Sequence, residues 1–220
     1  MPRPLLERAI RARGGPLTGL VLRAEAQVHS GVPGTWQYTR AFLAPDHYAW
    51  KIITGADPIY YLFDGTRVRS FVGSAEVSVD ANPRAPLRTH ARWTAVLTLD
   101  ALRAPGVAVT PLAAADLPPG VQEGLLVTYP DGASYRLGFD GQTRLVWMQG
   151  PLDLSPFAAG DVTARLADHR RTGGVLLPFA VSYALGTTPL ADEKVLTACV
   201  DPADLSSASF TAPTRLPDCR

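Results

Sequence analysis

Several features are scarce in this 220-residue chain, and each scarcity excludes a class of protein. No apolar run reaches the roughly 18 residues that a membrane-spanning helix needs. The net charge is only +1, from 21 basic and 20 acidic side chains, and the arginines form no basic stripe, so we expect no nucleic-acid partner. The N-terminal segment has no apolar signal-peptide core, so we expect either a cytoplasmic protein or one whose leader has been removed.

Reactive residues are few as well. The two cysteines, Cys199 and Cys219, lie near the C-terminus, where they could form a disulfide in an oxidising compartment or remain free thiols. The four histidines are scattered and show no metal-ligand spacing: His29, His47, His90 and His169. We therefore expect no metal site and no cofactor.

The usual signatures of catalysis are also missing. The sequence contains no G-x-S-x-G elbow, and its glycine pairs lack the spacing and the lysine of a phosphate-binding loop. Asp168 and His169 precede Ser182, but no strained elbow is visible for that serine, so a solvated turn is the better interpretation. We expect a protein that is not an enzyme.

Proline and glycine, by contrast, are abundant. Their 20 and 19 residues favour short strands joined by turns over a helical bundle. In the segment 47–54 a period of two predicts a strand with one buried face, formed by Tyr48, Trp50 and Ile52, while Ala49 belongs to the outer face. Asp-Gly turn signals and apolar alternation extend this pattern over most of the chain.

The resulting assignment has two helical segments among about ten strands. A helix is predicted over 4–13, ended by Gly14-Gly15, and a helix or helix pair over 84–105, followed by a loop over 106–122. Strands or hairpins are predicted over residues 17–28, 34–45, 47–54, 58–73 (turning at Asp64-Gly65), 123–150 (a three-stranded meander turning at Asp131-Gly132 and Asp140-Gly141), 161–170, 175–186 (after Gly173-Gly174), 194–200 and 207–213.

These elements predict a mainly β (α+β) fold in a single domain over 1–220. Short connections make the strands antiparallel, and a sheet of this many twisted strands curls, so we expect a curved antiparallel sheet that forms an unclosed barrel. The helix 4–13 and a helical lid over 84–105 cover the inner face of strands 17–80 and 123–213, and a short C-terminal tail follows.

Large apolar side chains are expected between the sheet and the lid. They would either pack as ordinary core or line a cavity that admits an acyl chain. The candidate lining residues are Trp36, Tyr48, Trp50, Ile52, Trp93 and Leu97.

Several phrases of the chain resemble the bacterial lipoprotein-carrier superfamily of LolA, LolB and LppX-type proteins, also called outer-membrane lipoprotein-sorting proteins. The segment from Asp168 to Pro178 matches a strand–turn–strand of the form D-Y-R-x-x-G-x-x-L-P, and Phe210 takes the place of a terminal aromatic residue. The resembling phrases are "LLERAIRARGG", "YTRAFLAPDHYAWKI", "YYLFDGTRV", "VTYPDGASYRLGFDGQTRLV", "VTARLADHRRTGGVLLPFAVSY" and "DPADLSSASFTAP".

The resemblance implies a monomeric periplasmic or exported protein, membrane-associated in some members, that holds a lipid or an acylated lipoprotein and meets inner- or outer-membrane partner proteins. Two features depart from the pattern. Arg84, Arg88 and Arg92 make the lid more polar at its edges, and the cavity arginine of such carriers has only Arg40 and Arg69 as candidates. The alternative is a non-carrying interaction or sensor module with a filled core on the same scaffold.

Overall fold

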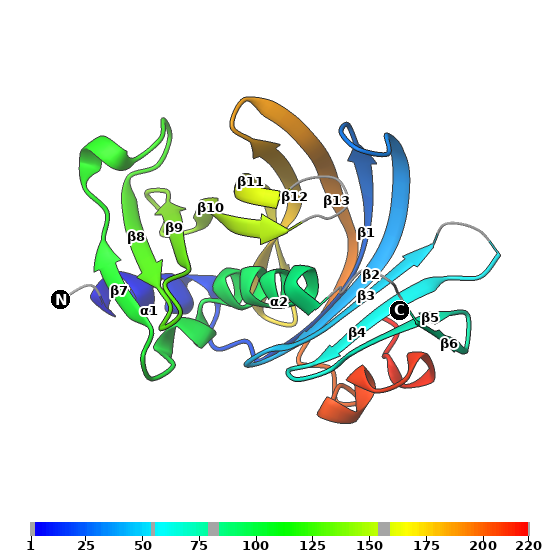
Figure 1. The fold of residues 1–220 in the computed structure, drawn as a ribbon. Coiled ribbons are helices and arrows are strands. Elements are labelled where there is room, and N and C mark those ends of the chain that lie inside the picture. The colour runs from blue at the N-terminus through cyan, green and yellow to red at the C-terminus, as the bar shows by residue number, and fades with distance from the viewer. Residues whose placement is uncertain (1–2, 54–55, 79–83, 154–158, 220) are drawn as a thin grey trace.

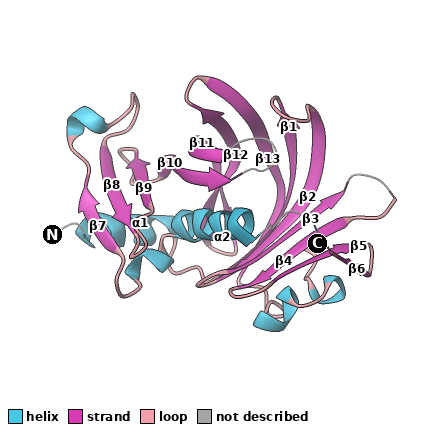
Figure 2. Cartoon of the chain, viewed as in Figure 1, coloured by secondary structure: helices cyan, strands magenta, loops and turns pink. Residues whose placement is uncertain are grey.

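The computed structural model describes residues 3–53, 56–78, 84–153 and 159–219 (Figure 1). Thirteen strands form one antiparallel sheet. As the sequence predicted, the sheet is not closed and curves around a central helix (Figure 2). The helices are α1 (Arg3–Arg13) and α2 (Arg84–Thr98). The strands are β1 (Gly19–Val28), β2 (Gly34–Leu43), β3 (His47–Ile53), β4 (Ile59–Asp64), β5 (Val68–Val72), β6 (Ala75–Val77), β7 (Ala108–Pro111), β8 (Glu123–Thr128), β9 (Ser134–Phe139), β10 (Leu145–Asp153), β11 (Ala159–Thr172), β12 (Val175–Leu185) and β13 (Thr188–Val200).

The order of the strands gives α2 its place. From β1 at the centre, the chain runs outward strand by strand to β6 at one edge of the sheet. It then passes through α2 to β7 at the opposite edge, and the strands return inward until β13 pairs with β1. Helix α2, which belongs to this crossing from one edge to the other, lies within the curve of the sheet (Figure 1).

Helix α2 packs against both arms of this sheet. Leu87 and Ala91 contact Tyr48 and Phe63 on β3 and β4. Trp93 lies further along α2. It belongs, with Val96 and Leu99, to the large cluster that β8 to β12 and α1 form. The helical spacing read from the sequence is confirmed because Leu87, His90, Trp93 and Val96 are all buried.

Helix α1 ends at the two glycines predicted to stop it. The amide of Gly15 donates to the Ile10 carbonyl at 3.0 Å, and that of Gly14 donates to the Arg11 carbonyl at 3.0 Å, which is the Schellman pattern. Gly14 has φ +121°, and a Cβ there would lie 2.2 Å from the Gly174 carbonyl oxygen. Glycine is required because the end of α1 abuts the β11–β12 turn.

The turn predictions hold because the aspartate side chains satisfy the turn backbone. The Asp64 carboxylate accepts hydrogen bonds from the amides of Thr66 (2.9 Å) and Arg67 (2.7 Å) between β4 and β5. Asp140 does the same for Gln142 and Arg144 between β9 and β10, both at 2.9 Å. These local bonds fix the register of each hairpin.

Several element boundaries differ from the prediction. The segment 84–105 is α2 followed by a short 3-10 helix, η1 (Asp100–Arg103), because Leu99 takes φ +62° and interrupts the α-helix. The predicted loop 106–122 contains the edge strand β7 and a single 3-10 turn, η2 (Ala114–Asp116). The sheet therefore has 13 strands where about ten were expected.

The predicted last strand, 207–213, is wrong. This segment forms the 3-10 helices η3 (Ser207–Phe210) and η4 (Pro213–Arg215), and a capping box between Ser206 and Ser209 starts the first of them. Phe210 is buried on the outer face of the sheet with Ala41, Ala49 and Leu62.

This C-terminal segment also corrects the expectation that strand 47–54 buries one face. Tyr48 and Ala49 are both fully buried, because the inner face packs on α2 and the outer face is covered by the segment that contains Phe210. A disulfide between Cys199 on β13 and Cys219 ties down its end, with the two Cα atoms 5.7 Å apart. Of the two alternatives that the sequence left open for these cysteines, the structure has the disulfide.

None of the described helices is long and apolar enough to cross a membrane.

Candidate ligand cavity

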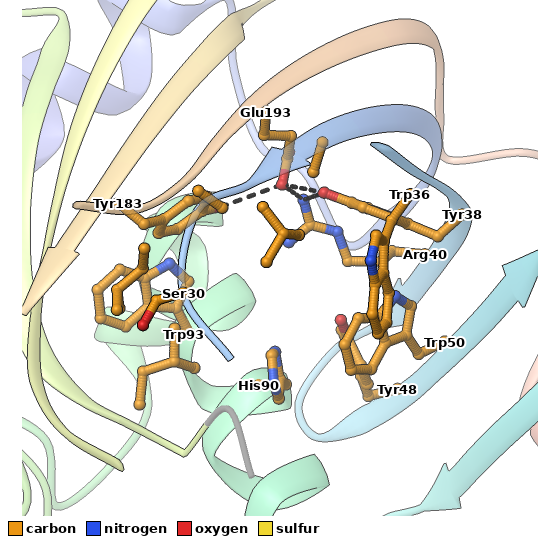
Figure 3. A pocket seen from close by; sticks show the side chains of 15 residues that line it. Ser30, Trp36, Tyr38, Arg40, Tyr48, Trp50, His90, Trp93, Tyr183 and Glu193 are labelled. Atoms are coloured by element: carbon orange, nitrogen blue, oxygen red, sulfur yellow. Dashed lines mark hydrogen bonds and ion pairs between the residues drawn. The ribbon is translucent and has the colours of Figure 1, made fainter. Parts of the chain in front are cut away.

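A cavity of about 100 Å³ lies between α2 and the inner face of the sheet (Figure 3). Strands β1, β2, β3, β10, β12 and β13 contribute its wall on the sheet side, and His90 and Trp93 of α2 contribute the lid side. A second, smaller cavity of about 40 Å³ lies deeper along the sheet and shares Arg40, Trp93, Tyr183 and Glu193 with the first.

Four of the six predicted lining residues meet in the larger cavity: Trp36, Tyr48, Trp50 and Trp93. Leu97 lines the smaller cavity. Ile52 lines neither of the two, although it lies on the predicted inner face and is buried.

The sequence prediction missed a polar cluster in the cavity wall. Arg40 of β2 forms an ion pair with Glu193 of β13, and the hydroxyl of Tyr38 donates to the same carboxylate oxygen. The hydroxyl of Tyr183 lies 3.3 Å from this oxygen (Figure 3). Of the two arginine candidates, Arg40 is therefore at the cavity, whereas Arg69 pairs with Glu76 on the edge strands β5 and β6.

One signal for Arg40 was present in the sequence. Arg40 follows Trp36 and Tyr38 at alternate positions of one strand, so an arginine falls in the inward register of an otherwise aromatic face. Glu193 lies 153 positions further along the chain, and only the pairing of β1 with β13 brings the two together.

Burial and mutual attraction set the ionisation of this cluster. Burial acts to lower the pKa of Arg40, but Glu193 and the surrounding tyrosines outweigh it and hold that pKa above its usual value. Burial raises the pKa of the Tyr38 hydroxyl, so it stays protonated and can donate to Glu193. The cluster thus places a paired positive and negative charge in a wall that is otherwise apolar.

His90 is the main contact between the lid and β3 inside the cavity. Its ring stacks on Tyr48 at a centroid distance of 5.7 Å and an interplanar angle of 22°, and it lies 5.2 Å from the Trp50 ring. Burial, reinforced by the charge of Arg40, lowers the pKa of His90 to about 3. The imidazole is therefore neutral at pH 7.

The segment weighed as a hydrolase triad does not form one. Asp168 pairs with Arg170, the His169 Nε2 atom lies 2.9 Å from the Leu145 carbonyl oxygen, and Ser182 lies opposite Arg165 on the neighbouring strand. The segment does form the strand–turn–strand that its resemblance predicted, between β11 and β12. After the turn, Val175, Leu177 and Phe179 are buried on the inner face of β12.

Comparison with known proteins places this geometry in a fold group. No protein-family model and no curated protein matches the sequence. Solved structures do match, and three examples cover nearly the whole chain. A DUF1329 family protein from Desulfovibrio piger has a TM-score of 0.60 at 9% identity, covering 97% of this chain and 98% of its own.

The other two structures carry names from lipoprotein sorting. The LolA superfamily protein NE2245 from Nitrosomonas europaea has a TM-score of 0.54 at 11% identity, with 97% of this chain and 98% of that chain covered. A domain named for outer membrane lipoprotein sorting, from Vibrio parahaemolyticus, has a TM-score of 0.54 at 9% identity, with 98% and 99% covered.

The chain therefore has the LolA-like fold: an open antiparallel sheet curved around a helix. The resemblance drawn from the sequence is confirmed at the level of the fold.

Proposed function

We propose that this protein binds the acyl chain of a lipid or of a lipidated protein in the cavity beneath α2, and carries it between membranes. The observation that supports the proposal most strongly is the cavity itself, because aromatic and aliphatic side chains from six strands and the lid surround a space that the core leaves unfilled. The LolA-like fold agrees with this role, since two of the similar structures carry lipoprotein-sorting or LolA names.

A long chain requires α2 to move. The cavity of about 100 Å³ is smaller than the roughly 150 Å³ that accommodates one benzene molecule. Ten buried methylenes would contribute on the order of 8 kcal/mol, part of which is offset by separating α2 from the sheet. A free energy of about 8 kcal/mol corresponds to a Kd near 1 μM, so the offset leaves Kd values between about 1 μM and about 1 mM.

The disulfide supports a periplasmic or exported location. Cys199 and Cys219 are paired, and such bonds persist in oxidising compartments but are rare in the cytosol. We therefore propose that the protein works outside the cytoplasm as a single-domain, non-enzymatic carrier. Its partners would be membrane proteins that deliver and accept the lipid.

A titration of delipidated protein with a fluorescent long-chain fatty-acyl probe tests the proposal. Ala26 lines the cavity, so Ala26→Phe should fill it and weaken binding at least tenfold, and Ala191→Leu should weaken it less. Ala115→Phe is the matched control because Ala115 lies exposed on η2, away from the cavity. Equal probe affinity in all four folded proteins would overturn the proposal and favour an interaction or sensor module with a filled core.

A further inference from the structure

Four polar atoms at one side of the cavity have no hydrogen-bond partner among the described residues. They are Tyr48 Oη, Trp50 Nε1, His90 Nε2 and Arg40 Nε, and each is shielded from solvent. Tyr48 is completely buried and His90 is 7% exposed. A buried polar atom without a partner costs about 1–3 kcal/mol, so four at one site call for an explanation.

The four groups form one cluster. The His90 ring lies 5.7 Å from the Tyr48 ring and 5.2 Å from the Trp50 ring. Arg40 lines the same cavity, and its charge acts on both Tyr48 and His90, although none of its N–H groups meets hydrogen-bond geometry with the Tyr48 hydroxyl. All four residues line the larger cavity, and Figure 3 shows their side chains converging on it from β2, β3 and α2.

The chemistry of these atoms defines the group that would satisfy them. An indole N–H and a guanidinium N–H can only donate, and a tyrosine hydroxyl donates readily. The ligand atom that complements Trp50, Arg40 and Tyr48 is therefore a hydrogen-bond acceptor. The neutral His90 ring donates through its other nitrogen to the Asp153 backbone, so its Nε2 accepts and would face an N–H or O–H of the same ligand. Because the charge of Arg40 is already paired with Glu193, the site carries no net charge and favours an uncharged acceptor over a carboxylate.

We propose that Tyr48, Trp50 and Arg40 form a subsite for the carbonyl oxygen of an acyl ester or amide whose hydrocarbon chain occupies the apolar part of the cavity, with His90 Nε2 as the acceptor for a neighbouring hydroxyl or amide N–H of that ligand. The inference rests on the proposed function and narrows it, since an ester- or amide-linked acyl group is preferred over a free fatty acid or a plain alkyl chain. Ala26, Leu152 and Leu190 supply the apolar wall beside this subsite.

Isothermal titration calorimetry with two matched ligands tests the subsite. Monolauroyl glycerol and its ether analogue, dodecyl glycerol, differ by one carbonyl oxygen. We expect the ester to bind about tenfold more tightly than the ether and more tightly than laurate. Tyr48→Phe and Trp50→Phe should each weaken binding of the ester several-fold more than binding of the ether, so that the preference for the ester shrinks.

Tyr129→Phe is the control variant, because the Tyr129 hydroxyl is also buried without a partner but lines neither of the two cavities described above. It should leave both affinities unchanged. Equal affinity for ester and ether, with no effect of Tyr48→Phe, would overturn the carbonyl subsite while the apolar cavity stands. Tighter binding of laurate than of the ester would overturn the choice of an uncharged acceptor. Failure of every ligand to bind would overturn the proposed function itself.

Discussion

At the scale of single residues, the ion pair between Arg40 and Glu193 dominates the cavity wall. Glu193 is 6% exposed, so removing one partner leaves the other charged and buried. Glu193→Leu should lower the free energy of unfolding by about 3–5 kcal/mol, whereas the double variant with Arg40→Met should recover most of that loss. Urea unfolding of the single variant, the double variant and the parent protein measures this. A double variant as unstable as Glu193→Leu would contradict the pairing.

His90 gives the protein a pH dependence of known sign. Its folded pKa of about 3 lies below the ordinary value of 6.5, so the unfolded chain binds a proton in this window and the folded chain does not. The free energy of unfolding should fall as the pH drops from 6.5 towards 3, by up to about 1.4 kcal/mol per pH unit. Asp153 faces the same ring and opposes this shift only in part.

The comparison of pH 7 with pH 5 in urea unfolding tests this dependence. His90→Phe should lose less stability than the parent protein over that interval. Burial lowers the pKa of His169 as well, but His169 contributes equally to both proteins, so the difference isolates His90. Identical losses in the two proteins would contradict a lowered pKa of His90 in the folded state.

At the scale of elements, a carrier role requires α2 to separate from the sheet when an acyl chain enters the cavity. Its contacts to β3 and β4 run through Leu87, Ala91 and His90, whereas Trp93 and Val96 anchor it to the opposite arm. Binding of monolauroyl glycerol should speed hydrogen exchange in the first half of α2 and leave β1 and β13 unchanged. Uniform protection of α2 on binding would contradict a moving lid.

Local elements were predictable from the sequence because their causes are local. Aspartate side chains satisfy the hairpin turns, Gly14 and Gly15 end α1, and a helical period marks the inner face of α2. The final segment was misread because its serines cap a 3-10 helix, while a short apolar alternation around Phe210 imitates a strand.

Properties that depend on distant pairing were not predictable in the same way. Three cavity aromatics, Trp36, Tyr48 and Trp50, could be named because strand alternation sets their direction, and Trp93 because of the helical period of α2. The partner of Arg40 could not be named, because Glu193 reaches it only through the pairing of β13 with β1. The cover over Ala49 likewise comes from a segment that is remote in sequence.

At the scale of the whole molecule, the disulfide holds the C-terminal segment against the outer face of the sheet. Cys199 and Cys219 are 20 positions apart, and closing a loop of this length restricts the unfolded chain by about 3 kcal/mol. Replacing both cysteines with alanine should lower the free energy of unfolding by about that amount. Calorimetric unfolding measures it, and an unchanged Tm would contradict a structural role for the bond.

The central claim is that the space beneath α2 holds an acyl chain. Native mass spectrometry of the protein purified from an oxidising compartment, with organic extraction of the bound material, tests it most directly. The account predicts an added mass of an acyl ester or amide that is lost in Ala26→Phe and retained in Ala115→Phe. A bare protein mass that persists after incubation with such lipids would contradict the claim and leave the LolA-like fold without a carrier role.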